Sequence, residues 1–149
     1  MSGRLLDLFG LQQGGVVAVA GAGGKTTLVY TLAGQAHAAG RRVLVTTTTH
    51  MGALPEDVTG PVFVEADGAA LPGLERALAE HGRATLLGRR VRADKLEGVS
   101  PQRVDALGGL ADLVLVEADG ARGRSLKIPA DHEPVVPSTA TLLVVVLGF

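Results

Sequence analysis

The chain has 149 residues, with 14 Lys plus Arg, 15 Asp plus Glu and a formal net charge of −1. A chain of this length buries about 68–70% of its unfolded surface and needs no disulfide, while a hydrophobic content of 46% excludes a disordered chain. The near-neutral charge argues against nucleic acid as the ligand, and the lack of cysteine excludes thiolate metal sites. No apolar run is long enough for a secretory signal or a membrane span, so we expect one cytoplasmic domain over residues 1–149.

Apolar runs alternate with helix-like segments along the chain. In chain order, the patterns predict a strand at 16–20, a helix at 26–39, strands at 42–49 and 61–65, a helix at 71–81, a short strand at 84–87, a helix at 101–107 with Ser100 as its N-cap, and strands at 113–117 and 141–147. The strands are unbroken apolar runs, as expected where helices cover both faces of a sheet. The repetition predicts an α/β fold, a doubly wound, mostly parallel sheet in three layers. Because the chain stops at Phe149, directly after the last strand, we expect either truncation at the C-terminus or a family tail that is absent here.

A glycine-rich stretch between the first strand and the first helix predicts a phosphate-binding loop. It reads Gly21, Ala22, Gly23, Gly24, Lys25, Thr26, Thr27. Its glycines allow successive N–H groups to point into one concavity, and the following helix N-terminus favours phosphate. Lys25 is expected to reach the phosphates of ATP or GTP, and the Thr26 hydroxyl to bind Mg²⁺. The pattern is the shorter G-x-x-G-K-T-T form, since the full P-loop pattern would need glycine where Val19 stands.

A P-loop protein also needs an acidic residue at the end of a neighbouring strand. Glu117 follows four apolar residues, with Asp119 two positions later. We expect Glu117 to act on the Mg²⁺ side and Asp119 to position or activate the attacking water. Gly120 completes an E-x-x-G turn that resembles a sensor of the γ-phosphate. Glu65 begins an identical EADG sequence and competes for the same role; the later copy is preferred because basic residues follow it.

Two further segments carry polar side chains of candidate function. Hydroxyls and a histidine end the second strand, and a cationic stretch follows the sensing turn. We expect them to contact a substrate or partner; they are Thr48, Thr49, His50, Arg122, Arg124, Lys127, His132 and Glu133. The alternative for each is a solvated loop residue. A looser basic stretch has no aromatic side chains for stacking and is interpreted as a solvated loop and not as a nucleic-acid patch; it consists of Arg83, Arg89, Arg90, Arg92 and Lys95, interrupted by Asp94.

The motifs GAGGKTT, TTTTHM, KLEGVSP and VEADGARGRSLKIPADHEPVVP resemble, in this order, the YqeC-like accessory proteins associated with selenium-dependent molybdenum hydroxylases. The resemblance spans nearly the whole chain. It implies a P-loop NTPase-like fold and a role in selenium cofactor biosynthesis or hydroxylase maturation, with the hydroxylase or another maturation protein as client. A weaker similarity to dimerising NTPases that mature metalloenzymes implies a homodimer.

The first interpretation is therefore an Mg²⁺-dependent protein that binds and hydrolyses ATP or GTP and assists maturation of a molybdenum hydroxylase. One alternative is an ATP-dependent small-molecule kinase or ligase, whose turnover would require a small substrate where a maturation NTPase would respond to its protein client. The other alternative is a nucleotide-binding module without turnover. Because the chain has no cysteine, it cannot carry selenium as a selenosulfide on its own thiol.

Overall fold

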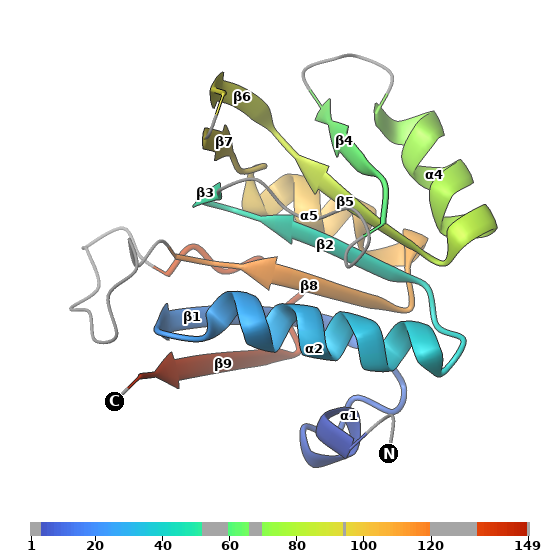
Figure 1. Ribbon diagram of the computed structural model, residues 1–149, viewed down its shortest axis with the longest axis vertical. Helices are drawn as coiled ribbons and strands as arrows, with labels where there is room; N and C mark the ends of the chain where they lie inside the picture. The colour runs from blue at the N-terminus through green and yellow to red at the C-terminus, as the bar shows by residue number, and fades with distance from the viewer. Residues whose placement is uncertain (1–3, 52–59, 66–69, 94, 120–133, 149) are drawn as a thin grey trace.

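The main sheet of the computed structural model is parallel throughout. The structure describes residues 4–51, 60–65, 70–93, 95–119 and 134–148. Within them, six strands pair in the order β4-β5-β2-β8-β1-β9 (Figure 1). Their bounds are β1 Gly15–Ala22, β2 Val43–Thr47, β4 Val62–Val64, β5 Arg83–Leu87, β8 Leu113–Glu117 and β9 Leu142–Leu147. The late strand β8 lies between β1 and β2, so the crossover from β1 to β2 passes over it.

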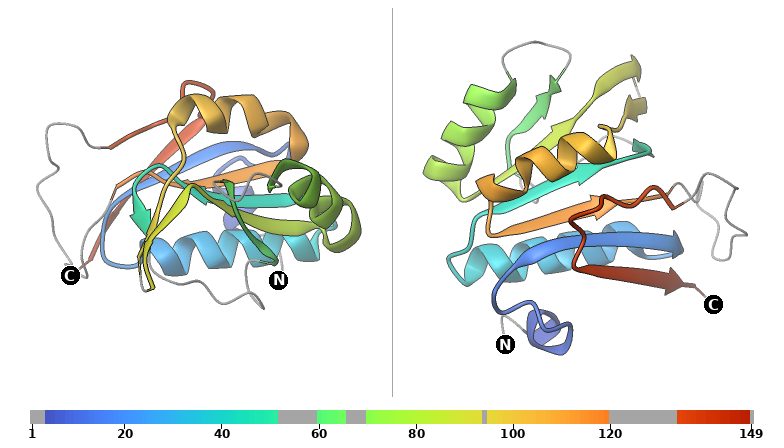
Figure 2. Two further views of the ribbon diagram at one scale, coloured as in Figure 1. Left: turned by 90° about the horizontal axis from the view of Figure 1, so that it is seen from above. Right: turned by 180° about the vertical axis from the view of Figure 1, so that it is seen from behind.

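Helices cover both faces of this sheet, as Figure 2 shows from above. On one face α1 (Arg4–Leu8) and α2 (Lys25–Ala38) pack on Val17, Val19 and Leu115. On the other, α4 (Ala70–His81) and α5 (Pro101–Leu107), which runs into the 3₁₀ turn Gly108–Leu110, pack on Val114 and Val116. Successive residues of one strand thus enter different cores, which explains the unbroken apolar runs. The predicted three-layer, doubly wound α/β fold is confirmed, and none of the described helices is long and apolar enough to cross a membrane.

The predicted strands and helices of the main sheet all occur, and Ser100 caps α5 by accepting a hydrogen bond from the Arg103 amide at 3.1 Å. The interpretation of the basic stretch as a solvated loop was wrong, although the strand predicted at 84–87 occurs. Residues 83–87 form β5, and β6 (Arg89–Arg92) pairs antiparallel with β7 (Lys95–Glu97), which also pairs with β3 (His50–Met51). All four side chains of β6 are exposed, so the hairpin forms without an apolar run that would predict a strand.

Strand β9 is covered on one face only within the described part of the chain. Leu142, Val144 and Val146 pack against the core beneath α2. The alternate residues are exposed, Leu143 at 44%, Val145 at 59% and Leu147 at 54%. The apolar run therefore predicted strand β9 correctly. The expectation that helices cover both faces of the sheet does not hold at β9 within the described residues.

A carboxylate on α5 fixes the segment that leads into β9. Asp105 accepts hydrogen bonds from the hydroxyl and amide of Ser138, at 2.6 and 3.3 Å, and from the hydroxyl and amide of Thr139, at 2.6 and 2.9 Å. The Ser138 hydroxyl, followed by the Thr139 hydroxyl and amide, lowers the pKa of Asp105 from 3.8 to about 2. Because these donors favour the ionised form, the contact stabilises the fold only while Asp105 is charged.

Replacing Asp105 by Asn is expected to lower the stability of the protein in a pH-dependent way. The folded-state pKa lies below the unfolded value, so this contribution is fully present above the unfolded pKa and disappears as the pH falls to about 2. Thermal unfolding of parent and Asp105→Asn should therefore differ most near pH 6 and converge near pH 2. Glu75→Gln, at an exposed position of α4, is the control. A gap that stayed constant down to pH 2 would contradict the assignment.

Candidate functional site

The candidate site lies where the carboxyl ends of β1, β8 and β2 meet. Glu117, the last residue of β8, pairs with Val19 of β1 on one side and Thr47 of β2 on the other. Ligands of open α/β sheets bind at the carboxyl ends of the strands, where neighbouring connections diverge. The glycine-rich loop, residues 21–27, follows β1 at this edge, so the predicted loop and the predicted acidic strand end are neighbours.

The backbone of the glycine-rich loop is left-handed at three positions. Gly21, Gly23 and Gly24 have φ values of 97°, 78° and 89°. Gly24 is also the N-cap of α2, and no side chain caps the helix there. The first amides of α2 therefore lack a side-chain acceptor, and they carry the partial positive charge of a helix N-terminus. Such an arrangement has the chemistry of an anion site.

The ammonium of Lys25 points into the protein and contacts Asp119. Its Nζ lies 2.5 Å from Asp119 Oδ1 and donates to the Asp119 carbonyl oxygen, also at 2.5 Å. The second carboxylate oxygen, Oδ2, accepts the Gly21 amide at 3.0 Å. Lys25 is 6% exposed and Asp119 2% exposed, so the pair is buried. The loop lysine and the strand-end acid are thus joined directly.

Glu117 lies beside this pair in a partly buried position. Burial raises the pKa of Glu117, Lys25 opposes this, Asp119 raises it further, and a hydrogen bond from the Thr26 hydroxyl lowers it. Burial and the charge of Glu117 also raise the pKa of Tyr30 on α2. The carboxyl therefore lies among groups that partly oppose its ionisation, and a cation nearby would favour the charged form.

The donor set at Thr26 and Glu117 fits Mg²⁺. A hydroxyl and a carboxyl oxygen are hard ligands, and Mg²⁺ in nucleotide sites keeps several waters and uses one or two protein oxygens together with phosphates. The described residues contain no group of three or more His, Cys, Asp or Glu that could hold a metal by themselves.

The threonine run after β2 is held by internal hydrogen bonds. The Thr47 hydroxyl donates to the Glu117 carbonyl at 2.9 Å and accepts the Thr49 amide at 3.1 Å, while the Thr48 hydroxyl donates to the Val135 carbonyl at 2.6 Å. Gly98, which the sequence analysis gave no role, lies against this turn: a Cβ there would be 2.4 Å from the Thr47 carbonyl oxygen and 2.5 Å from that of Thr49. Its place in the KLEGVSP motif was the only signal.

Two other candidate residues, His50 and Glu65, belong to neither β1, α2 nor β8. His50 is exposed on β3, within the small sheet. Glu65 follows β4, at the opposite edge of the main sheet from β9, and forms an ion pair with Arg103 of α5. Glu65, the first residue of the competing EADG sequence, is therefore not brought to the glycine-rich loop, whereas Glu117 is.

The remaining candidates lie outside the described residues. They are Gly120, Arg122, Arg124, Lys127, His132 and Glu133. The described residues on either side of this segment meet at the site: the Val135 amide donates to the Ala118 carbonyl at 2.8 Å, and the Val135 carbonyl accepts the Thr48 hydroxyl. Ala118 and Val135 therefore lie together at the edge of the sheet that carries the loop.

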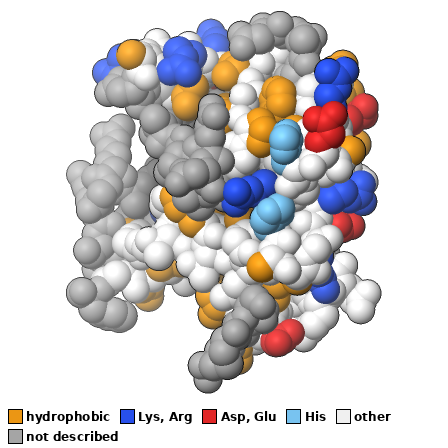
Figure 3. Space-filling view, turned by 45° about the vertical axis from the view of Figure 1, so that its right-hand side comes forward, with side chains coloured by type: hydrophobic (Ala, Val, Ile, Leu, Met, Phe, Trp, Pro, Cys, Tyr) orange, Lys and Arg blue, Asp and Glu red, His pale blue; other side chains and the backbone are white. Residues whose placement is uncertain are grey.

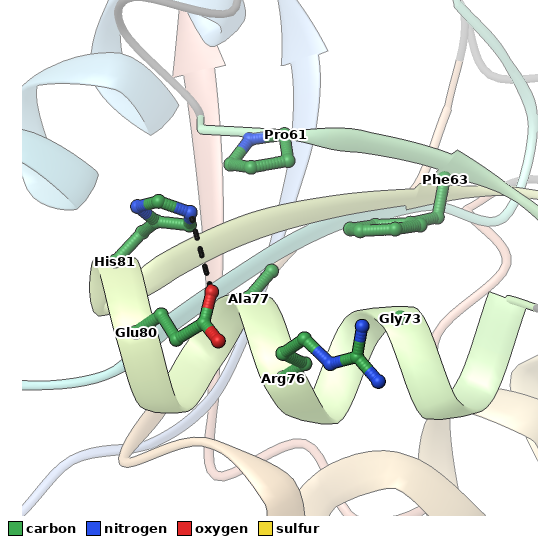
Figure 4. A pocket seen from close by; sticks show the side chains of 7 residues that line it. All are labelled: Pro61, Phe63, Gly73, Arg76, Ala77, Glu80 and His81. Carbon is green, nitrogen blue, oxygen red and sulfur yellow. Dashed lines mark ion pairs between the residues drawn. The ribbon is translucent and has the colours of Figure 1, made fainter.

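A second hollow lies between β4 and α4, with a volume of about 210 Å³. Figure 4 shows the Phe63 ring over Gly73, with Glu80 and His81 at one end, where Glu80 Oε2 and His81 Nε2 are 3.9 Å apart. Both are exposed, so this hollow lacks the buried, converging polar groups of a built site.

Figure 3 shows basic side chains at the upper end of the molecule, where Figure 1 places the β6–β7 hairpin.

Alanine at Gly21 is expected to destabilise the protein, and alanine at Gly34 to stabilise it. At Gly21 a Cβ would lie 2.1 Å from the Val146 carbonyl oxygen of β9 and would require a positive φ. Gly34 is helical with nothing within 4 Å of a Cβ, so alanine there should add about 0.5–1 kcal/mol. Urea unfolding measures both free energies, and Gly21→Ala should lose more than about 1 kcal/mol. Equal stability of Gly21→Ala and parent would contradict the close approach of β1 and β9.

Comparison with known proteins agrees with this arrangement of motifs. Residues 17–149 match the YqeC protein family. The chain is 38% identical over 149 residues to "Uncharacterized protein YqeC" of Escherichia coli (strain K12), an alignment that covers 99% of this chain and 57% of that relative. No solved structure matches significantly. The family match covers most of the chain, and we conclude that the chain belongs to the YqeC family.

Proposed function

We propose that the protein binds a nucleoside triphosphate with Mg²⁺ at the glycine-rich loop. One observation carries the proposal: a left-handed glycine turn leads into the uncapped N-terminus of a 14-residue helix, with a lysine at its first position and a carboxyl from the neighbouring strand beside its second. Backbone amides, an ammonium and an oxygen donor pair for Mg²⁺ are the groups that a triphosphate requires.

Each residue has a part in this proposal. The loop amides and Lys25 bind the phosphates, and the Thr26 hydroxyl and the Glu117 carboxyl hold Mg²⁺. When bound, Mg²⁺ neutralises charge on the phosphate oxygens. Ala22 is buried at the end of β1, so it contributes backbone alone. The base, adenine or guanine, is left open by these residues.

Hydrolysis of the bound nucleotide is the next step of the proposal. Water would attack the γ-phosphorus, the bond to the β-phosphate oxygen would break, and the products would be a nucleoside diphosphate and phosphate. Both Asp119 oxygens are engaged by Lys25 and Gly21 in the free protein. In this proposal the nucleotide draws Lys25 away from Asp119, and the carboxylate oxygen that is released accepts a hydrogen bond from the attacking water.

The biological role we propose is that of an accessory protein in selenium cofactor biosynthesis or the maturation of a selenium-dependent molybdenum hydroxylase. Its support is the family resemblance carried by the loop and by the VEADGARGRSLKIPADHEP block. We expect the cationic residues of that block, which lie outside the described residues, to contact a client or an anionic substrate. Turnover that increases with an apo-hydroxylase, and not with a small acid or alcohol, would separate this role from a kinase or ligase.

Lys25→Ala is expected to weaken binding of Mg-nucleotide at least tenfold, or about 1.4 kcal/mol. Calorimetric titration with ATP and with GTP, each with and without Mg²⁺, measures the affinity and identifies the base. Because the variant leaves Asp119 buried without its cation, circular dichroism must show that it is folded. Arg76→Ala, on the exposed side of α4, is the matched loss of a basic side chain. Unchanged affinity in folded Lys25→Ala would overturn the phosphate assignment.

The two EADG copies provide a second test with a built-in control. Glu117→Gln is expected to reduce the Mg²⁺ dependence of nucleotide binding, since Glu117 lies beside Thr26. Glu65→Gln should leave it unchanged, since Glu65 pairs with Arg103 at the other edge of the sheet. Titrating Mg²⁺ at fixed nucleotide gives both values. The reverse ranking would show that the metal-side acid had been assigned to the wrong copy.

A further inference from the structure

The carboxylate of Asp119 occupies the position of an anion in the glycine-rich loop. It accepts from the Gly21 amide and from the Lys25 ammonium, two donors that the proposed nucleotide site would direct at phosphate. Its exposure of 2% means that no solvent separates it from these donors. In the free protein the Asp119 carboxylate therefore already uses two of the donors that would bind a phosphate.

We propose that Asp119 is an internal competitor of phosphate, which lowers the affinity of the loop for every phosphate anion so that a single phosphate does not occupy it. The inference rests on the proposed function and specifies its ligand class. A side chain held in place acts at a high effective concentration, on the order of millimolar or more. Only a ligand with several linked phosphates gains enough contacts along the loop to displace it.

The geometry explains how the exchange can occur without unfolding. Lys25 contacts both the carboxylate and the carbonyl oxygen of Asp119. An ammonium has three protons, so it can keep the carbonyl contact and turn one proton from the carboxylate to a phosphate oxygen. Phosphate binds only to protein in which the Lys25–Asp119 contact is open. The observed dissociation constant is therefore the intrinsic one divided by the fraction of open protein.

Glu117 supplies the matched control because it is a second carboxyl in the same site with different partners. The Thr26 hydroxyl lowers its pKa, and within the described residues the hydrogen bonds of Lys25 and of the Gly21 amide go to Asp119 and not to Glu117. Neutralising Glu117 removes a negative charge near the phosphates but leaves the competitor in place. The difference between the two variants therefore separates competition for Lys25 from general electrostatics.

The test is calorimetric titration of parent, Asp119→Asn and Glu117→Gln with inorganic phosphate and with pyrophosphate, in buffer containing EDTA and no Mg²⁺. Asp119→Asn should bind both anions at least tenfold more tightly than parent, by a similar factor for each, since both must displace the same contact. Glu117→Gln should gain clearly less. Equal or weaker binding by Asp119→Asn, with pyrophosphate still bound by parent, overturns the competitor and leaves the proposed function standing. No binding of pyrophosphate by any of the three overturns the competitor, and the titrations with nucleotide and Mg²⁺ then decide the proposed function separately.

A measurement on the parent protein avoids dependence on the folding of a variant. The side-chain carboxyl ¹³C resonance of Asp119 should shift when pyrophosphate saturates the protein, because the carboxylate loses Lys25 as a donor. The carboxyl of Asp112, which pairs with Arg42 at the start of β8, is the control and should not move. An unchanged Asp119 resonance in the saturated protein would contradict the displacement.

Discussion

Lys25 and Asp119 meet inside the protein, where an ammonium and a carboxylate persist only if the polar groups around them are also satisfied. Removing one partner from a buried ion pair costs about 3–5 kcal/mol, because the other charge remains in a poorly solvating environment. Here the remaining atoms are satisfied by the Gly21 amide and the Asp119 carbonyl, and no buried side-chain nitrogen or oxygen among the described residues lacks a partner. The pair therefore fixes the loop after β1 against the end of β8. The left-handed glycines are what allow the loop to make that approach.

The sequence predicted the elements of the main sheet because each is a short apolar run bounded by glycine or polar residues. It could not predict that β8 lies between β1 and β2, because strand order depends on which faces pack together and not on local pattern. The β6–β7 hairpin was missed because it has no apolar run of the kind that predicts the strands of the main sheet. Its strand β6 has four exposed side chains, and its pairing rests on backbone hydrogen bonds that leave no periodic signal.

The threonine run shows why polar residues at a strand end are difficult to assign to function from sequence. Hydroxyls at this place could meet a phosphate, a metal or a substrate, but those of Thr47 and Thr48 donate to carbonyl groups of Glu117 and Val135. They connect β2, β8 and the segment before β9, and Gly98 leaves room for their turn. Their contribution is to position the acidic strand end, which is compatible with a site but does not require direct contact with a ligand.

The two copies of the EADG sequence show how topology decides chemistry that sequence leaves open. Both follow an apolar strand, and both begin with a carboxyl that could hold Mg²⁺. The first copy follows β4, at the edge of the sheet, and its Glu65 neutralises Arg103. The second follows β8, beside β1, and its Glu117 lies between Lys25, Asp119 and the Thr26 hydroxyl. A carboxyl of raised pKa that lies next to an uncapped helix N-terminus gains more from an arriving cation than one already paired with arginine. The difference between Glu65 and Glu117 is therefore set by the strand beside each one, and of these two described residues Glu117 has the surroundings that the proposed nucleotide site requires.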